Sequence, residues 1–186
     1  MTTIARLLVA LLLALTGALV VGAPAAAAAP ACDPTVGSQP KTAALMSTSP
    51  LVAIRTGHDR CWDRVVFQVA GSVGAGWDVR YVDTVVQDGS GAPLAVPGGA
   101  RLSVVLHHPS TDEQGAPTYP ARIGPVANVV GSPTLRSVVF GGSFEGYTTV
   151  GVGVRARLPF RVFTLAGPGG DTRIVLDVLH GWDAGR

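Results

Sequence analysis

Short runs in which apolar and polar residues alternate, each closed by glycine or proline, fill the chain after Pro30. Between residues 64 and 69, for example, Val65, Phe67 and Val69 share one face, which is the two-residue period of a half-buried β-strand. No stretch beyond that proline keeps a 3.6-residue apolar period without an intervening Gly or Pro. Eight or nine such runs at this spacing predict an all-β fold, built as an antiparallel β-sandwich or as a barrel.

The other expected strands are spread along the chain and are separated by Gly-rich or Pro-containing turns. Residues 29–50 are rich in Pro, Ser, Thr and Ala, and we expect them to form a flexible leader before a single domain at 51–182. Residues 107–133 carry five prolines and predict one long loop over the surface. The other expected strands are residues 51–54, 77–82, 102–106, 136–140, 148–154, 160–165 and 173–179. Residues 85–87 and 94–96 are expected to form a hairpin around the Gly-rich turn at 88–91.

The first 28 residues have the three parts of a secretory signal peptide. Arg6 supplies the positive charge, an apolar run from Leu7 to Val21 follows, and small residues then offer a cleavage site, which we place after Ala28. The alternatives are a membrane anchor and acylation of Cys32. The apolar run is shorter than the roughly 20 residues of a spanning helix, and Ala29 stands where a lipoprotein signal carries an aliphatic residue. We expect a secreted protein with no stable membrane insertion after signal cleavage.

The two cysteines are best explained as one disulfide, because an exported chain folds in an oxidising compartment. A Cys32–Cys61 bond would tie the start of the mature chain to a turn before the strand at 64–69. The closed loop of about 30 residues would stabilise the fold by roughly 3–4 kcal/mol. We therefore expect no free thiol nucleophile.

Composition and motif spacing exclude several classes of function. Hydrophobic residues make up 47% of the chain, which is incompatible with intrinsic disorder. Lys and Arg number 14 against 12 Asp and Glu, so the chain lacks the basic field of a nucleic-acid binder, and we expect no nucleic-acid partner. There is no G-x-S-x-G elbow and no C-x-x-C. We expect no cofactor and no metal, because none of the four histidines has ligand spacing: His58, His107, His108 and His180.

A hydrolase is the main alternative, with Glu145 and Asp177 as a carboxylate pair and His58 as a further candidate. Asp177 lies mid-strand, out of phase with its apolar neighbours. Such a carboxylate is more simply explained as the partner of Arg173 on its own face, or of an arginine on an adjacent strand. The hydrolase requires two or more of these side chains in one cleft.

Arginines and aromatic residues lie close together in several segments. This combination suits sugar or peptide recognition, because rings stack on apolar faces and guanidinium groups pair with carboxylates. Arg155, Arg157 and Arg161 are near Phe160 and Phe163, and we expect both phenylalanines to be core residues. We expect exposure for the aromatic residues that fall in turns or near the C-terminus, namely Trp62, Tyr119 and Trp182.

Three segments together resemble the AMIN-like domain family of exported actinobacterial proteins. They are residues 55–67, residues 140–146, and residues 158–163 with 173–178, within a matching region from Leu51 to His180. The resemblance implies a β-sandwich related to the AMIN domains of cell-wall amidases and secretin pilus proteins, which bind peptidoglycan or envelope partners and are not catalytic. It carries over no catalytic residues. The characteristic positions map to Arg55, His58, Asp63, Arg64, Phe67, Phe160, Arg161, Arg173 and Asp177.

These observations lead us to expect a secreted, non-catalytic binding module located outside the cell, at the cell wall. The expected partner is cell-wall glycan, peptidoglycan above all, or an envelope protein. A second alternative to this function, beside the hydrolase, is a protein-interaction module that accepts an added strand at a sheet edge. A long, uncovered edge without charge or proline would favour that alternative. The residues expected to bind are Arg55, His58, Arg64, Arg155, Arg161 and Tyr147.

Overall fold

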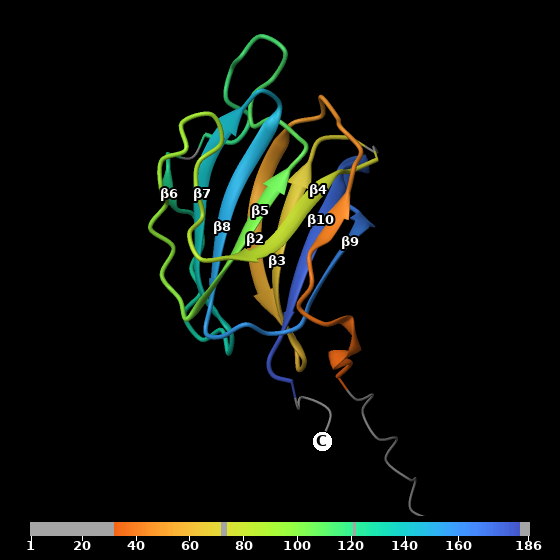
Figure 1. The fold of residues 1–186 in the computed structure, drawn as a ribbon. Coiled ribbons are helices and arrows are strands. Elements are labelled where there is room, and N and C mark those ends of the chain that lie inside the picture. Colours follow the sequence, from red (N-terminus) through yellow and green to blue (C-terminus); the bar gives the residue numbers. More distant parts are fainter. Residues whose placement is uncertain (1–31, 72–73, 121, 183–186) are drawn as a thin grey trace, which may run out of the picture. The chain divides into compact units, whose positions relative to one another are not determined.

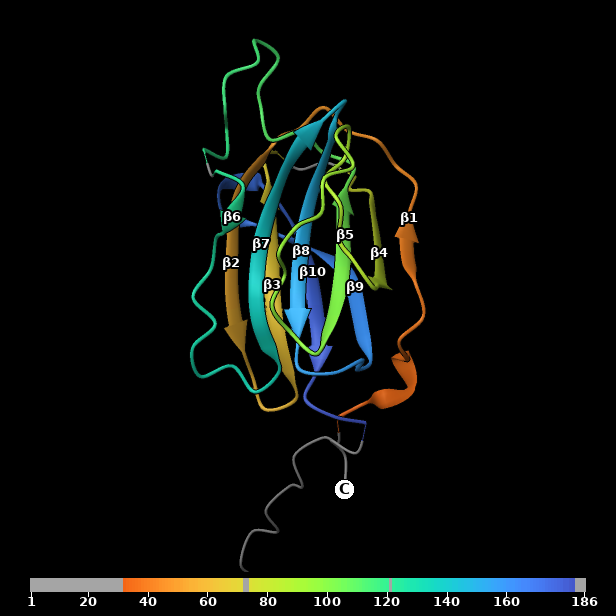
Figure 2. The same cartoon turned by 60° about the vertical axis from the view of Figure 1, so that its left-hand side comes forward.

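Two antiparallel sheets make up almost all of the regular structure in the computed structural model, as Figures 1 and 2 show. The structure describes residues 32–71, 74–120 and 122–182, so the expected signal peptide lies outside the described residues. The helices found among the described residues are two three-residue 3-10 turns, η1 (Pro34–Val36) and η2 (Pro168–Gly170). No helix in this part of the chain is long and apolar enough to cross a bilayer. The predicted antiparallel β-sandwich is confirmed.

Sheet A has six strands and sheet B has four, and every neighbouring pair is antiparallel. In spatial order, sheet A consists of β1 (Lys41–Ala43), β4 (Trp77–Val82), β5 (Ala100–Leu106), β8 (Tyr147–Val154), β7 (Leu135–Phe144) and β6 (Gly124–Pro125). Sheet B consists of β2 (Leu51–His58), β3 (Trp62–Val69), β10 (Thr172–Leu179) and β9 (Phe160–Ala166).

The core lies between the two sheets and follows from the alternation of the strands. Phe67 of β3 and Phe160 of β9 are fully buried, as are Leu176 of β10 and, from sheet A, Leu102 and Val152. Because successive residues of a strand point to opposite faces, each buried position fixes its neighbours on the outside of the sandwich. The outward residues of sheet B therefore include Arg64 and Gln68, on either side of the inward Phe67 and Val65.

The predicted disulfide is confirmed. Cys32 and Cys61 are bonded, with 5.5 Å between their Cα atoms, and they pack with Trp62 and Leu179 at one end of sheet B. The chain then continues to β1, which pairs with β4 inside the segment expected to be a flexible leader. A three-residue strand is too short to show an alternation in the sequence, which explains why it was not expected.

The expected strands at 85–87 and 94–96 are not strands of either sheet. Residues 83–98 form a covering loop that packs Val85, Leu94 and Val96 onto Val139 of β7, and a single isolated bridge joins Val86 to Pro93. Glycines of β7 and β8 make this approach possible. A Cβ atom added to Gly153 would lie 1.8 Å from the carbonyl oxygen of Pro97, so the backbone of the covering loop replaces a side chain there.

Candidate binding face of sheet B

The outward face of sheet B gathers arginines around an apolar strip. The strand register sets this arrangement, because Arg64, Asp177 and Arg161 stand side by side on β3, β10 and β9. The next outward row continues with Val66, Val175 and Phe163, in the same strand order. We refer to this surface as the sheet B face. Its members are Arg55, Arg64, Val66, Gln68, Arg161, Phe163, Leu165, Arg173, Val175 and Asp177.

A buried carboxylate holds the two central arginines in place. Asp177 is fully buried, and its Oδ1 accepts a hydrogen bond of 2.6 Å from Nε of Arg64. Its Oδ2 accepts bonds of 2.8 Å from Nη2 of Arg64 and 3.0 and 2.8 Å from Nε and Nη2 of Arg161. Hydrogen bonding to Asp177, together with its negative charge, raises the pKa of Arg64. Two guanidinium groups share one carboxylate, so the cluster keeps one positive charge in excess.

The same arginines lie over aromatic rings. The guanidinium carbon of Arg161 is 4.3 Å from the ring centre of Trp62 and 5.1 Å from that of Phe163. The guanidinium of Arg64 is 5.7 Å from the Phe163 ring. The side chains of Arg64 and Arg161 remain 34% and 40% exposed, so the cluster combines a fixed geometry with access to solvent.

Two expectations about the aromatic residues are wrong. Trp62 is buried beneath Arg161 and the disulfide, although its place in a turn predicted exposure. Phe163 lies partly exposed on the outward side of β9, although it was expected in the core. The cause is its register, because Phe163 shares the parity of Arg161, whereas Phe160 points inward. Trp182 is 49% exposed, as expected.

A second set of polar contacts fixes the other end of the sheet B face. Arg55 donates a hydrogen bond to Oε1 of Gln68, and Nε2 of Gln68 donates one of 2.5 Å to Asp171. The hydrogen bonds from Gln68 and from the backbone N–H of Gly71 lower the pKa of Asp171. Arg173 donates through Nε and Nη2 to the carbonyl oxygen of Ala166. Asp177 is therefore paired across strands, with Arg64 and Arg161, and not with Arg173 on its own strand.

The sequence-predicted binding residues fall into two groups. Arg55, Arg64 and Arg161 come together on the sheet B face. The others lie elsewhere, because His58 has the opposite parity to Arg55 on β2, Arg155 follows β8, and Tyr147 begins β8. Arg155 donates to the carbonyl oxygen of His180, and the Tyr147 ring packs edge-on against His107 at 5.3 Å.

The residues of the hydrolase alternative do not share a cleft. Asp177 is enclosed by two arginines, whereas Glu145 stands in the turn after β7 with a positive φ of 47°. In Figure 2 the arrowheads of β7 and β2 point in opposite directions, so that turn and the end of β2, where His58 lies, are at opposite ends of the sandwich. Within the described ranges, no group of three or more His, Cys, Asp or Glu residues could hold a metal ion.

Several members of the sheet B face were missed from the sequence, and Asp63 was not expected to join the two layers. Val66, Gln68 and Val175 gave no chemical signal, and only their parity with Arg64 and Asp177 could have indicated them.

Asp63 of β3 is fully buried and accepts hydrogen bonds of 2.6 and 2.7 Å from the N–H groups of residues 134 and 135, at the start of β7. Its other oxygen lies 3.2 Å from Nε2 of His180.

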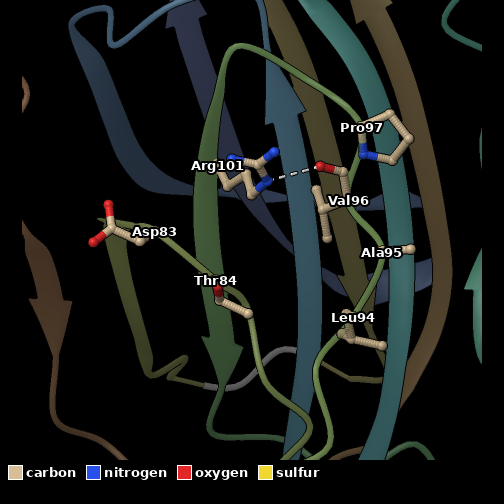
Figure 3. A pocket seen from close by; sticks show the side chains of 7 residues that line it. All are labelled: Asp83, Thr84, Leu94, Ala95, Val96, Pro97 and Arg101. Atoms are coloured by element: carbon tan, nitrogen blue, oxygen red, sulfur yellow. Dashed lines mark hydrogen bonds between the residues drawn. The ribbon is translucent and has the colours of Figure 1, made fainter.

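A hollow on the opposite side of the sandwich is less suited to binding a sugar or peptide. It has a volume of about 430 Å³ and lies between β5 and the covering loop, as Figure 3 shows. Nε of Arg101 donates a bond of 3.0 Å to the carbonyl oxygen of Val96, and the Asp83 side chain points away from Arg101. No aromatic ring lines it. Its lining residues are Asp83, Thr84, Leu94, Ala95, Val96, Pro97 and Arg101.

Comparison with known proteins identifies the family. The model of the AMIN-like domain matches residues 49–180, a range that includes the whole sheet B face and both sheets except β1. No curated protein and no solved structure is significantly similar to the chain. Because the match covers most of the sequence, the protein belongs to the AMIN-like domain family, which points to a binding module associated with the cell envelope.

Proposed function

We propose that this chain is a secreted, non-catalytic module that binds cell-wall glycan, peptidoglycan above all, through the sheet B face. The observation that carries the proposal is the cluster of Arg64, Asp177 and Arg161 beside the partly exposed ring of Phe163. It combines fixed hydrogen-bond donors with an apolar surface. The membership of the chain in an envelope-associated family supports the choice of ligand.

The chemistry of the sheet B face matches that of a cell-wall polymer. Sugar rings have apolar faces that stack on aromatic and aliphatic side chains. Phe163 and Val66 are partly exposed in one row, with the buried Val175 between them. Peptide stems carry carboxylates, which guanidinium groups bind in two-pronged fashion. Asp177 uses Nε and one N–H of Nη2 on both central arginines, which leaves Nη1 and the second N–H of Nη2 on each for a ligand.

Secretion is part of the same proposal. The expected signal peptide at residues 1–28 would deliver the chain to the compartment where peptidoglycan lies. The Cys32–Cys61 bond agrees with folding in an oxidising environment. Mass measurement of the protein isolated from culture medium tests both points, since cleavage after Ala28 and the disulfide each give a defined mass.

Sedimentation with isolated cell walls tests the binding. We expect the mature chain, residues 29–186, to be retained at low ionic strength and released as salt is raised, because the central contacts are charged. Arg161→Ala should weaken retention about tenfold, as loss of a central arginine contact does in other interfaces. Asp177 keeps its two bonds to Arg64 in this variant, so the fold should survive.

Arg80→Ala is the matched control. Arg80 also forms an ion pair, with Asp78, but on sheet A, and its loss should leave retention unchanged. An equal loss of wall retention in both variants would show that the chain binds the wall through its overall positive charge and not through the sheet B face. No retention of the wild-type chain at low salt would overturn the glycan proposal. Release of soluble wall fragments during incubation would overturn the non-catalytic part.

A further inference from the structure

The four edge strands of the two sheets differ in how well they are protected against pairing with another chain. Exposed edges are commonly shortened, bulged, covered, or interrupted by proline or lysine. In sheet A, β1 has three residues and begins with a lysine that follows a proline, and β6 has two residues and ends in proline. In sheet B, β2 has a register shift between Leu51 and Ala53, and Oγ1 of Thr56 donates to the carbonyl oxygen of Asn128 in a neighbouring loop.

The remaining edge strand, β9, has none of these features between Arg161 and Leu165, although the backbone of Gly37 covers its first residue, Phe160. It is seven residues long, contains neither proline nor lysine, and pairs with β10 without a register shift. Its one charged residue, Arg161, is directed onto the sheet B face by its bonds to Asp177. Thr164, Leu165 and Ala166 are exposed. This strand therefore offers an edge to which another strand can add.

The free backbone groups of β9 can be assigned from the hydrogen bonds at its ends. The N–H of Phe160 donates to the carbonyl oxygen of Gly37, away from β10, so every second residue after Phe160 also faces away from β10. At the other end, Arg173 donates to the carbonyl oxygen of Ala166. Between these ends, the outward N–H and C=O groups of Val162 and Thr164 bond to no other residue in the described part of the chain.

We propose that β9 is a self-association edge, at which β9 of a second copy of this chain pairs antiparallel. One symmetric register uses all four free groups and no group that is already bonded. Beyond Leu165 the second copy must turn away from the edge, because Gly37 already lies beside Phe160. It places Val162 opposite Thr164 of the second copy, and Thr164 opposite the second copy's Val162. The two pairs exchange four hydrogen bonds, and the two-fold axis passes through Phe163.

The side chains agree with this register. Phe163 meets its own counterpart across the axis in a non-hydrogen-bonded pair, where side chains are closest, and aromatic pairs at such positions are favourable. Arg161 meets Leu165 of the second copy, so no like charges are opposed. This self-complementarity is the reason for choosing a second copy over an unrelated peptide as the partner.

The dimer would join two sheet B faces into one continuous surface. A polymer could then contact both copies at once, which raises the apparent affinity without any new contact to the polymer. The dimer itself does not depend on the proposed ligand. Its interface is centred on three residues of each copy and lies below the roughly 1,000 Å² of stable interfaces, so we expect a dissociation constant on the order of 0.1–1 mM.

Sedimentation equilibrium of residues 29–186, at concentrations up to about 1 mM, tests for the dimer. We expect the mean mass to rise with concentration for the wild-type chain and for Thr164→Val, which keeps the backbone N–H. Thr164→Pro should remain monomeric, because proline removes an outward donor without removing a bond to β10. A monomeric wild-type chain at all concentrations, or a dimer that Thr164→Pro does not weaken, would overturn the proposal.

Cross-linking tests the register. In the proposed pair the Cα atoms at position 163 are about 4.5 Å apart, within the range of a disulfide, so Phe163→Cys should form a covalent dimer under mild oxidation. Leu165→Cys is the matched control, because its two thiols would be separated by four residues, about 13 Å along the strands. Equal cross-linking of both variants would overturn the register. Wall retention by Thr164→Pro, measured by sedimentation with isolated cell walls, tests the ligand apart from the dimer. A chain that dimerises but does not bind walls would overturn the proposed ligand alone, and a chain that binds walls but stays monomeric would overturn the dimer alone.

Discussion

The outward faces of the two sheets differ in the size and charge of their side chains. On sheet A, Gly141, Gly151 and Gly153 leave the backbone of β7 and β8 bare, and the covering loop packs directly onto it. On sheet B, the corresponding surface carries Arg64, Arg161, Val66 and Phe163, which stay partly exposed. One face has been closed by the chain itself, and the other remains open.

The contrast has a physical cause. A segment can approach a sheet closely only where side chains are absent, and its apolar residues then add to the core. Covering the arginines of sheet B would instead remove charged groups from water, which is costly without new partners. The open face is therefore the one that can be satisfied by a polar ligand, and the two faces should respond differently to substitution.

The largest expected effect concerns the buried carboxylate of the open face. Asp177→Asn removes the charge that holds Arg64 and Arg161 together, and breaking such a pair typically costs 3–5 kcal/mol when fully buried. Because both arginines are partly exposed, we expect a loss of about 3 kcal/mol in the free energy of unfolding, measured with urea. Asp78→Asn breaks the exposed Arg80 pair on sheet A and should cost under about 1 kcal/mol. Equal losses would contradict the structural role of Asp177.

A smaller effect is expected from filling the backbone of the closed face. In Gly153→Ala the added Cβ would lie 1.8 Å from the carbonyl oxygen of Pro97 and 2.4 Å from Oγ of Ser137, so the covering loop must shift. We expect a loss of about 2 kcal/mol in urea unfolding and faster proteolysis within residues 83–98. Gly57→Ala, on β2 of sheet B, meets no atom within 4 Å and should be close to neutral. A neutral Gly153→Ala would show that the loop does not depend on this glycine.

The same contrast explains what the sequence could and could not predict. Alternation around Phe67 and Ile174 identified the strands. The phase of Asp177 indicated an arginine partner, either Arg173 on its own strand or an arginine on an adjacent strand, and the structure shows the second. The hairpin around the Gly-rich turn was expected and is present, since the N–H of Leu94 donates to the carbonyl oxygen of Val85 and a bridge joins Val86 to Pro93. Its position on top of β7, outside both sheets, was not expected, because apolar pairs around such a turn look alike whether they pair in a sheet or pack onto one. The role of Gly141, Gly151 and Gly153, which leave room for the covering loop, can be recognised only when β7 and β8 are known to be neighbours.

Burial that depends on distant segments was also out of reach. Trp62 is covered by Arg161 and by Cys32, which come from parts of the chain far from it in sequence. His108 was expected in an exposed loop, but it is fully buried, and its Nδ1 lies 2.9 Å from the carbonyl oxygen of Ser49. Neither environment leaves a trace in the local pattern of residues.

The smallest expected effect is a dependence on pH that arises at His108, beside sheet A. Burial, and to a lesser degree the nearby His107, lowers the pKa of His108 below its usual 6.5, and its buried Nε2 has no partner among the described residues. Below pH 6.5 the unfolded chain therefore binds a proton that the folded chain does not, so stability should fall as the pH drops and stay constant above that value. The arginines of the sheet B face keep their charge across this range.

Urea unfolding on either side of pH 6.5 measures this loss. His108→Asn should reduce the slope, because the side chain that cannot bind a proton in the fold is gone, whatever the variant costs in absolute stability. The control, His58→Asn, removes an exposed histidine and should leave the slope unchanged. A slope that persists in His108→Asn would place the titrating group elsewhere. A slope lost only in His58→Asn would assign the pH dependence to the end of β2 on sheet B.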